Sequence, residues 1–169
     1  MRALVERFGC ESVLRTGARQ VRVALGRGGV RADKREGDGA TPWGLLPLRG
    51  ILYRADRLTA ADRAVLAGTL PSAPIARCDG WCDDPSHADY NTAVTLPHPA
   101  RHECLWREDD LYDIVGVLGW NDDPVVGGRG SAIFLHVAAD GFTPTEGCLA
   151  LARPDLLALL GAGLSEIEV

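Results

Sequence analysis

The chain has 169 residues, 46% of them hydrophobic, and a formal net charge of −5 at pH 7. This length and apolar content predict one folded domain over residues 1–169 and exclude a largely disordered chain. The acidic balance argues against general nucleic-acid binding, and no apolar stretch approaches the roughly 20 residues needed to cross a bilayer.

Short apolar runs, separated by 20 glycines and 10 prolines, predict a mainly β fold with a few short helices. The expected strands cover residues 20–25, 45–53, 93–96, 114–120, 131–138 and 148–152. Pro47 interrupts the second of these, which predicts a position near a sheet edge. Thr59 fits the N-cap of a short helix over residues 59–66, and the leucines of residues 155–161 predict a C-terminal helix covering the sheet. Residues 101–113 fit a short helix or an irregular segment equally well.

The cysteines form an odd set of five, at positions 10, 78, 82, 104 and 148. This count fits one free reactive thiol plus two disulfides in an oxidising compartment, and it equally fits five reduced thiols in a cytosol. Cys78 and Cys82 are separated by three residues, and with His87 and His98 downstream a zinc site is conceivable. Because no second cysteine pair completes such a site, the sequence predicts no metal.

A histidine and a cysteine stand on either side of one short loop near the C-terminus. His136 lies in the strand expected over residues 131–138, and Cys148 opens the next apolar run. A base beside a thiol suits nucleophilic catalysis, because it raises the fraction of thiolate. Gly147 lets the backbone approach a substrate closely, and its amide and that of Cys148 could hold an oxyanion. A core histidine and a small core cysteine are the ordinary alternatives.

This stretch resembles the L,D-transpeptidase catalytic domain family (YkuD-type), in which an apolar strand ending in His-Gly precedes a loop and Ser/Thr-His-Gly-Cys-Ile/Val-Arg. Four residues match that pattern: His136, Thr145, Gly147 and Cys148. Three others replace the family's glycine, second histidine and arginine: Val137, Glu146 and Ala150. The loop is also shorter than usual. Residues 41–44 (TPWG) look like the family's Thr-Pro-x-Gly segment, so the resemblance spans residues 20–152.

The resemblance implies a YkuD-like β-sandwich or barrel-like sheet with a C-terminal helix, and a peptidoglycan L,D-transpeptidase. Cys148 would attack a stem-peptide carbonyl to give a thioester, and His136 would take the thiol proton and return it to the departing amine. The side-chain amine of a diaminopimelate on a second stem would then open the thioester and form a cross-link. Opening by water would make the protein an L,D-carboxypeptidase or amidase. A non-catalytic wall-binding module and a cytosolic thiol protein are further alternatives.

The implied partners are donor and acceptor stem peptides, with no cofactor, no nucleic acid and no membrane span, and we expect a monomer. The family implies a periplasmic or cell-wall location. The first residues show charges and no apolar signal core, so a cytoplasmic location is the alternative.

Glu146 and Thr145 are expected to contact substrate beside the nucleophile. A carboxylate at position 146 would repel the thiolate, raise the pKa of Cys148 and favour an amine-bearing acceptor. We therefore expect an altered choice of donor or acceptor, with 1,3 links between L-alanine and diaminopimelate as the candidate product. The common alternative is a 3,3 link between two diaminopimelates.

Three residues outside the motif are further candidates for substrate binding. Arg54 and Arg57 would bind free carboxylates of a stem peptide, although an Asp–Arg network at the surface is the more ordinary interpretation. Asn121 follows a predicted strand and either faces the cleft or simply forms a turn. The charged loop over residues 32–42 would lie near the substrate cleft if it follows the family, and it would otherwise be a solvated surface loop.

Overall fold

The structure is a computed structural model that describes residues 1–9, 11–68 and 70–169. Its strands are β1 (Arg2–Phe8), β2 (Glu11–Thr16), β3 (Arg19–Ala24), β4 (Val30–Arg31), β5 (Thr41–Pro42), β6 (Leu45–Tyr53), β7 (Ser72–Pro74), β8 (Asp79–Cys82), β9 (Ala93–Thr95), β10 (His102–Cys104), β11 (Ile114–Leu118), β12 (Phe134–Val137), β13 (Leu149–Leu151) and β14 (Glu166–Glu168). Its helices are α1 (Ala60–Leu66), α2 (Arg153–Gly161) and the 3-10 turn η1 (Asp140–Phe142).

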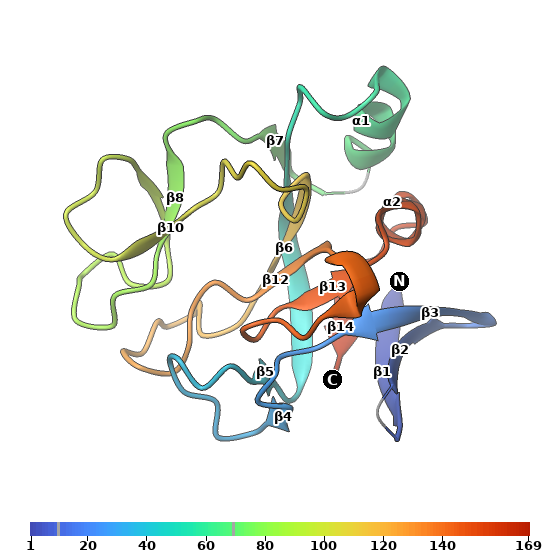
Figure 1. Ribbon diagram of the computed structural model, residues 1–169, viewed down its shortest axis with the longest axis horizontal. Coiled ribbons are helices and arrows are strands. Elements are labelled where there is room, and N and C mark those ends of the chain that lie inside the picture. The colour runs from blue at the N-terminus through green and yellow to red at the C-terminus, as the bar shows by residue number, and fades with distance from the viewer. Residues whose placement is uncertain (10, 69) are drawn as a thin grey trace.

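Within the described residues, the largest sheet has the strand order β11-β12-β13-β3-β2-β1-β14-β6-β7. Because β11 also pairs with β6, eight of these strands close into a barrel-like sheet and β7 extends from it. A smaller sheet, β10-β8-β9, stands to one side of the barrel, and the two helices lie together on the other (Figure 1). This smaller sheet brings residues 79–104 beside the barrel strands that carry the candidate motif.

Strand β12 separates two apolar clusters. Leu135 and Val137 belong to the larger cluster, which also contains the buried leucines of α2. Phe134 belongs to the smaller cluster, where the ring of Tyr112 meets it edge-on with ring centroids 5.9 Å apart. Because successive strand side chains point to opposite faces, His136 shares the Phe134 face. The helix therefore covers one face of β12, and the other face is left for the candidate site.

The mainly β fold with a C-terminal helix is confirmed. The six expected strands appear as β3, β6, β9, β11, β12 and β13, several of them shorter than expected. Thr59 caps α1 as predicted: its hydroxyl accepts a hydrogen bond from the Asp62 amide, and the Asp62 carboxylate accepts one from the Thr59 amide, both at 3.1 Å. Such a capping box satisfies two amide donors that the helix itself leaves without partners.

The expected edge position of β6 is wrong. β6 pairs with β11 along one side and with β14 and then β7 along the other. Pro47 lies opposite Glu166 of β14, and its carbonyl accepts a hydrogen bond from the Gly119 amide at 2.7 Å. The proline is tolerated because only its donor is missing from the ladder. Residues 101–113 contain the short strand β10 followed by turns, which is closer to the irregular alternative.

Four cysteines are free thiols in the described part of the chain: Cys78, Cys82, Cys104 and Cys148. Cys10 lies outside the described residues. No helix among the described residues has the length and apolar character to span a membrane.

Candidate active site

Two neighbouring parallel strands set the positions of His136 and Cys148. β12 and β13 pair with Leu135 opposite Leu149 and with His136 opposite Ala150. Cys148 immediately precedes β13 and shares a face with Ala150, two residues along. His136 and Cys148 therefore lie on one face of the sheet, and both line a cavity of about 260 Å³.

Backbone groups of the segment opposite hold the Cys148 thiol. Its Sγ donates a hydrogen bond to the Ala132 carbonyl at 3.2 Å and accepts one from the Phe134 amide at 3.4 Å. Burial raises the pKa of Cys148 to about 12, and the Glu103 carboxylate adds to that increase. The sulfur is therefore a neutral thiol at pH 7 before substrate binds.

His136 is also buried, with 6% of its surface exposed. Its Nδ1 lies 2.8 Å from the Val137 carbonyl, and because a carbonyl only accepts, Nδ1 carries the proton and donates it. Burial lowers the pKa of His136 to about 4, so the ring is neutral at pH 7 and Nε2 is its free base. Among the described residues, the hydrogen bonds of the His136 and Cys148 side chains go to backbone atoms and do not join the two side chains.

The turn before Cys148 is shaped by Thr145 and Gly147. The Thr145 hydroxyl donates to the Cys148 carbonyl at 2.7 Å and accepts from the Gly147 amide at 3.2 Å. Gly147 has φ +135°, and a Cβ there would stand 2.8 Å from the Ala40 carbonyl oxygen. The position therefore requires glycine both for its backbone angle and for the close approach of the loop opposite. Thr145 acts on the backbone of this turn while it also lines the cavity.

Glu146 lines the cavity and pairs with Arg27, which is not part of the cavity lining. Its carboxylate accepts from Arg27 Nε at 2.8 Å, and both side chains are largely exposed. The pKa of Cys148 is raised as the sequence suggested, but burial is the main cause and Glu103 is the carboxylate that contributes. The expectation that Glu146 causes the increase is therefore wrong, because its charge is paired and solvated.

Glu103 and Tyr112 are site residues that sequence reasoning missed. Both line the cavity with Cys148, and the Tyr112 hydroxyl donates to Glu103 Oε2 at 2.7 Å. Burial raises the pKa of both groups. The Tyr112 ring also meets the His136 ring edge-on, with centroids 5.4 Å apart. Glu103 reaches the site through the pairing of β10 with β8, and no local sequence pattern marked that strand.

A second cavity, of about 360 Å³, also contains Cys148. Glu103 and Glu146 line both cavities, so the thiol stands where two arms of one cleft meet. Lys34 lines the second arm; its side chain is 3% exposed, and its Nζ donates to Asp38 at 2.5 Å. The charged loop over residues 32–42 thus forms part of the cleft wall, as the family resemblance implied, and a fully solvated loop is excluded.

The other carboxylates of the second arm are also held in place. Glu36 Oε2 accepts from the hydroxyls of Tyr90 at 2.5 Å and Ser131 at 2.7 Å. Asp83 accepts from Arg101 Nε at 2.9 Å. The arm therefore has four carboxylates in its lining, those of residues 36, 83, 103 and 146, against two cationic side chains, those of residues 34 and 101.

Arg54, Arg57 and Asn121 lie outside the lining of both arms. Arg54 is buried, binds the Asp56 carboxylate through two nitrogens and stacks over the Trp106 ring at 3.6 Å. Arg57 donates to the buried Asp113 carboxylate at 3.0 Å. The Asn121 amide bonds the backbone of its own turn at Val126 and Gly130. Arg54 and Arg57 therefore form Asp–Arg pairs, but Arg54 and Asp113 are buried, so the pairs are not the surface network of the ordinary alternative. Asn121 forms a turn.

The described residues contain one His/Asp group close enough to share a metal ion, and it includes neither Cys148 nor His136. The site at Cys148 thus offers a buried thiol, a neutral imidazole and hydrogen-bond donors for acyl transfer without a metal ligand set.

Comparison with known families agrees with this chemistry. A family model for the L,D-transpeptidase catalytic domain (YkuD) matches residues 12–162, which include both strands of the site and the loop between them. Searches of curated proteins and of solved structures found no match. The family implies a cysteine-dependent enzyme that acts on peptidoglycan. The chain therefore belongs to the YkuD family of L,D-transpeptidase catalytic domains.

Proposed function

We propose that the protein is a peptidoglycan L,D-transpeptidase that works through a thioester on Cys148. The observation that carries this proposal is that a thiol and a neutral imidazole line one cavity within a chain of this family. The sulfur attacks a stem-peptide carbonyl while His136 Nε2 takes the thiol proton. His136 then returns the proton to the departing amine as the tetrahedral intermediate collapses to the thioester.

Because the Cys148 thiol and the His136 imidazole are both neutral at pH 7, the thiolate forms only as the sulfur attacks the substrate. The pKa of about 12 for Cys148 and about 4 for His136 oppose a resting thiolate–imidazolium pair. Proton transfer therefore needs the substrate in place, which protects the thiol from unproductive chemistry between turnovers. Glu103 opposes early ionisation, because its charge favours the neutral thiol.

Oxyanion stabilisation falls to the amides of Gly147 and Cys148. The Gly147 amide donates to Thr145 Oγ1 at 3.2 Å, so binding of the oxyanion would compete with this long hydrogen bond. Losing one oxyanion donor typically costs about 3–4 kcal/mol of transition-state stabilisation. The backbone angle of Gly147 sets the direction of this amide, which is why we include the glycine among the catalytic positions.

The two arms of the cleft favour transfer to an amine over hydrolysis. A transpeptidase holds two substrates on either side of its nucleophile, and Cys148 lines both cavities. The arm with four carboxylates and two cationic side chains suits an acceptor that brings an amine. We assign the donor stem to the arm that contains His136, because the base must reach the thiol and the departing amine there.

The product we propose is a cross-link of altered type, with the 1,3 link between L-alanine and diaminopimelate as the candidate. Glu146 supports this choice through its position on both arms and its pairing with Arg27, since it presents a carboxylate where the family has a histidine. Analysis of cross-links in digested sacculi from cells that express wild type or Glu146→His tests the assignment. An unchanged product mixture would remove Glu146 from the explanation.

The central test is intact-mass detection of an acyl-enzyme. Incubation with purified muropeptides should add the mass of an acyl donor to wild type and not to Cys148→Ala. His136→Gln should form the adduct far more slowly while it keeps the thiol. Release of the adduct as a cross-linked dimer when acceptor muropeptide is added would support transpeptidation, whereas release only as free acid would assign an L,D-carboxypeptidase. Absence of any Cys148-dependent adduct would refute acyl transfer.

A further inference from the structure

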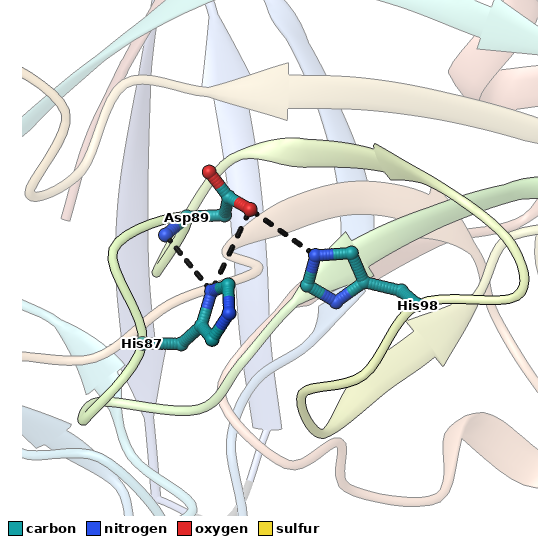
Figure 2. Close-up of side chains that lie close together, drawn as sticks. All are labelled: His87, Asp89 and His98. Atoms are coloured by element: carbon teal, nitrogen blue, oxygen red, sulfur yellow. Dashed lines mark hydrogen bonds and ion pairs between the residues drawn. The ribbon is translucent and has the colours of Figure 1, made fainter.

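The loops of the smaller sheet gather two histidines and an aspartate that the reaction does not use. His87 and Asp89 lie in the loop between β8 and β9, and His98 follows β9. Figure 2 shows a ring nitrogen of each imidazole directed at the same Asp89 carboxylate oxygen. One potential ligand atom from each residue lies within 4.8 Å of the other two.

The spacing of these atoms is close to that of a tetrahedral metal site. Asp89 Oδ2 is 3.1 Å from His98 Nε2 and 3.5 Å from His87 Nδ1. Zinc bonds of 2.0–2.1 Å to nitrogen and oxygen place neighbouring ligands of a tetrahedron about 3.3–3.4 Å apart. The two distances from the Asp89 oxygen to the imidazole nitrogens are therefore already close to those of a tetrahedral site. Only the distance between the two imidazole nitrogens has to shorten.

The cluster is largely buried at His98 and exposed to solvent at Asp89. The His98 side chain is 11% exposed and its ring lies 5.0 Å from that of His87, whereas the Asp89 side chain is 52% exposed. A cation can therefore reach the carboxylate from solvent and keep water as a further ligand. Imidazole nitrogen with carboxylate oxygen is a ligand set that suits zinc.

Binding would exchange two weak contacts for coordinate bonds. The Ala100 amide donates to His98 Nδ1 at 3.3 Å, and the Asp89 amide donates to His87 Nδ1 at 3.2 Å. Coordination through His98 Nε2 moves the proton of that ring to Nδ1. The protonated Nδ1 can no longer accept the hydrogen bond from the Ala100 amide. Coordination through His87 Nδ1 replaces the contact with the Asp89 amide. Both lost bonds are long for an N–H donor.

We propose that His87, Asp89 and His98 form a binding site for a zinc-type divalent cation that clips together the two loops of the smaller sheet. Such a site differs from the expectation that the sequence binds no metal, which considered these histidines only with Cys78 and Cys82. The ligand set forms instead from one carboxylate and two imidazoles, because the loops fold onto each other.

The clip connects to the wall of the catalytic cleft through the residues that follow Asp89. Tyr90 donates to Glu36 in the second arm at 2.5 Å. Asn91 Oδ1 accepts from the Ala132 amide at 3.0 Å, and the Ala132 carbonyl accepts the Cys148 thiol. A cation at Asp89 therefore stabilises the loop that positions these contacts, and its function is structural.

Zinc binding to the metal-free, full-length protein tests the proposal. Calorimetric titration with zinc chloride should give one site in wild type, and Asp89→Asn and His98→Gln should each weaken binding by at least about tenfold, the scale seen even for outer-shell partners. Zinc should raise the melting temperature of wild type and not that of these variants. Circular dichroism in the presence of a chelator checks that each metal-free variant is folded. If His98→Gln does not fold, Asp89→Asn alone tests the site.

The matched control removes three thiols, because cysteine is itself a common zinc ligand. A variant with Cys78, Cys104 and Cys148 each changed to serine should bind zinc as wild type does. Loss of binding in this variant together with unchanged binding in Asp89→Asn and His98→Gln would overturn the proposal. Absence of any bound zinc in wild type would also overturn it. Neither result would affect the assignment of acyl transfer to Cys148, because that adduct is measured without metal.

Discussion

The buried neutral imidazole of His136 should make folding stability depend on pH in a way that one substitution removes. In the folded protein the pKa of His136 is about 4, whereas an unfolded histidine titrates near pKa 6.5. Between these values the unfolded chain binds a proton that the folded protein does not, so stability falls as the pH falls from about 6.5 toward 4. Above pH 7 both states are neutral, and the full stability is present.

The two pKa values set the size of this effect. A gap of about 2.5 pH units corresponds to about 3.4 kcal/mol at acidic pH, since each unit is worth 1.36 kcal/mol. Between pH 7.5 and pH 4.5 the loss works out to about 2.5 kcal/mol, because most of the unfolded-state titration is complete by then. The group is buried, so solvent screens little of this difference.

Urea unfolding of wild type and His136→Gln at both pH values measures the effect. Other groups also titrate in this range, but they do so in both proteins and cancel in the comparison. Wild type should lose about 2.5 kcal/mol more than the variant on going to pH 4.5, whatever the cost of the substitution at pH 7.5. Equal losses of stability in the two proteins would show that the fold does not hold the His136 imidazole neutral. That result would refute the protonation states assigned to the site.

Three further outcomes test the groups around the nucleophile. Iodoacetamide at pH 8 should modify Cys148 far more slowly than the exposed Cys78 and Cys104, because a pKa of about 12 leaves on the order of one thiol in 10⁴ ionised. Equal labelling in peptide mass mapping would contradict this. Glu103→Gln should lower the pKa of Cys148 and speed its alkylation, since the carboxylate favours the neutral thiol; a pH profile of alkylation identical to that of wild type would exclude this role. Gly147→Ala should reduce the free energy of unfolding by about 1–3 kcal/mol from its left-handed φ alone, and the 2.8 Å approach to a carbonyl adds to this cost. A change within about 0.5 kcal/mol in urea unfolding, as at a neutral surface position, would contradict the close packing of that turn.

Much of the local structure followed from residues that are close together along the chain. Thr59 indicated the start of α1, and the structure adds a capping box with Asp62. The apolar run over residues 45–53 indicated β6 with its observed bounds. The expectation that Pro47 marks an edge failed, because the partners β11 and β14 arrive from distant segments.

The candidate site likewise contains residues that the sequence identified and residues that only the fold brought there. His136 and Cys148 were identifiable because they flank one loop, and their strands pair directly. Glu103 was not identifiable, because the pairing of β10 with β8 brings it to the thiol across more than 40 residues of sequence. Arg54 was expected to bind a substrate carboxylate or to join an Asp–Arg network at the surface, but the fold covers it with Trp106 and leaves 4% of it exposed.

The sequence by itself therefore determined the β-rich class, the N-cap of α1, the family motif and the candidate pair of nucleophile and base. These features depend on periodicity and on neighbours a few residues apart, which a single chain displays directly. Only the tertiary structure decided which carboxylate lies beside the thiol, that two arms meet there, and that His87, Asp89 and His98 converge. The first two features depend on the register between strands far apart in sequence, where a shift of one residue would turn each side chain to the opposite face. The third depends on how the two loops on either side of β9 fold onto each other.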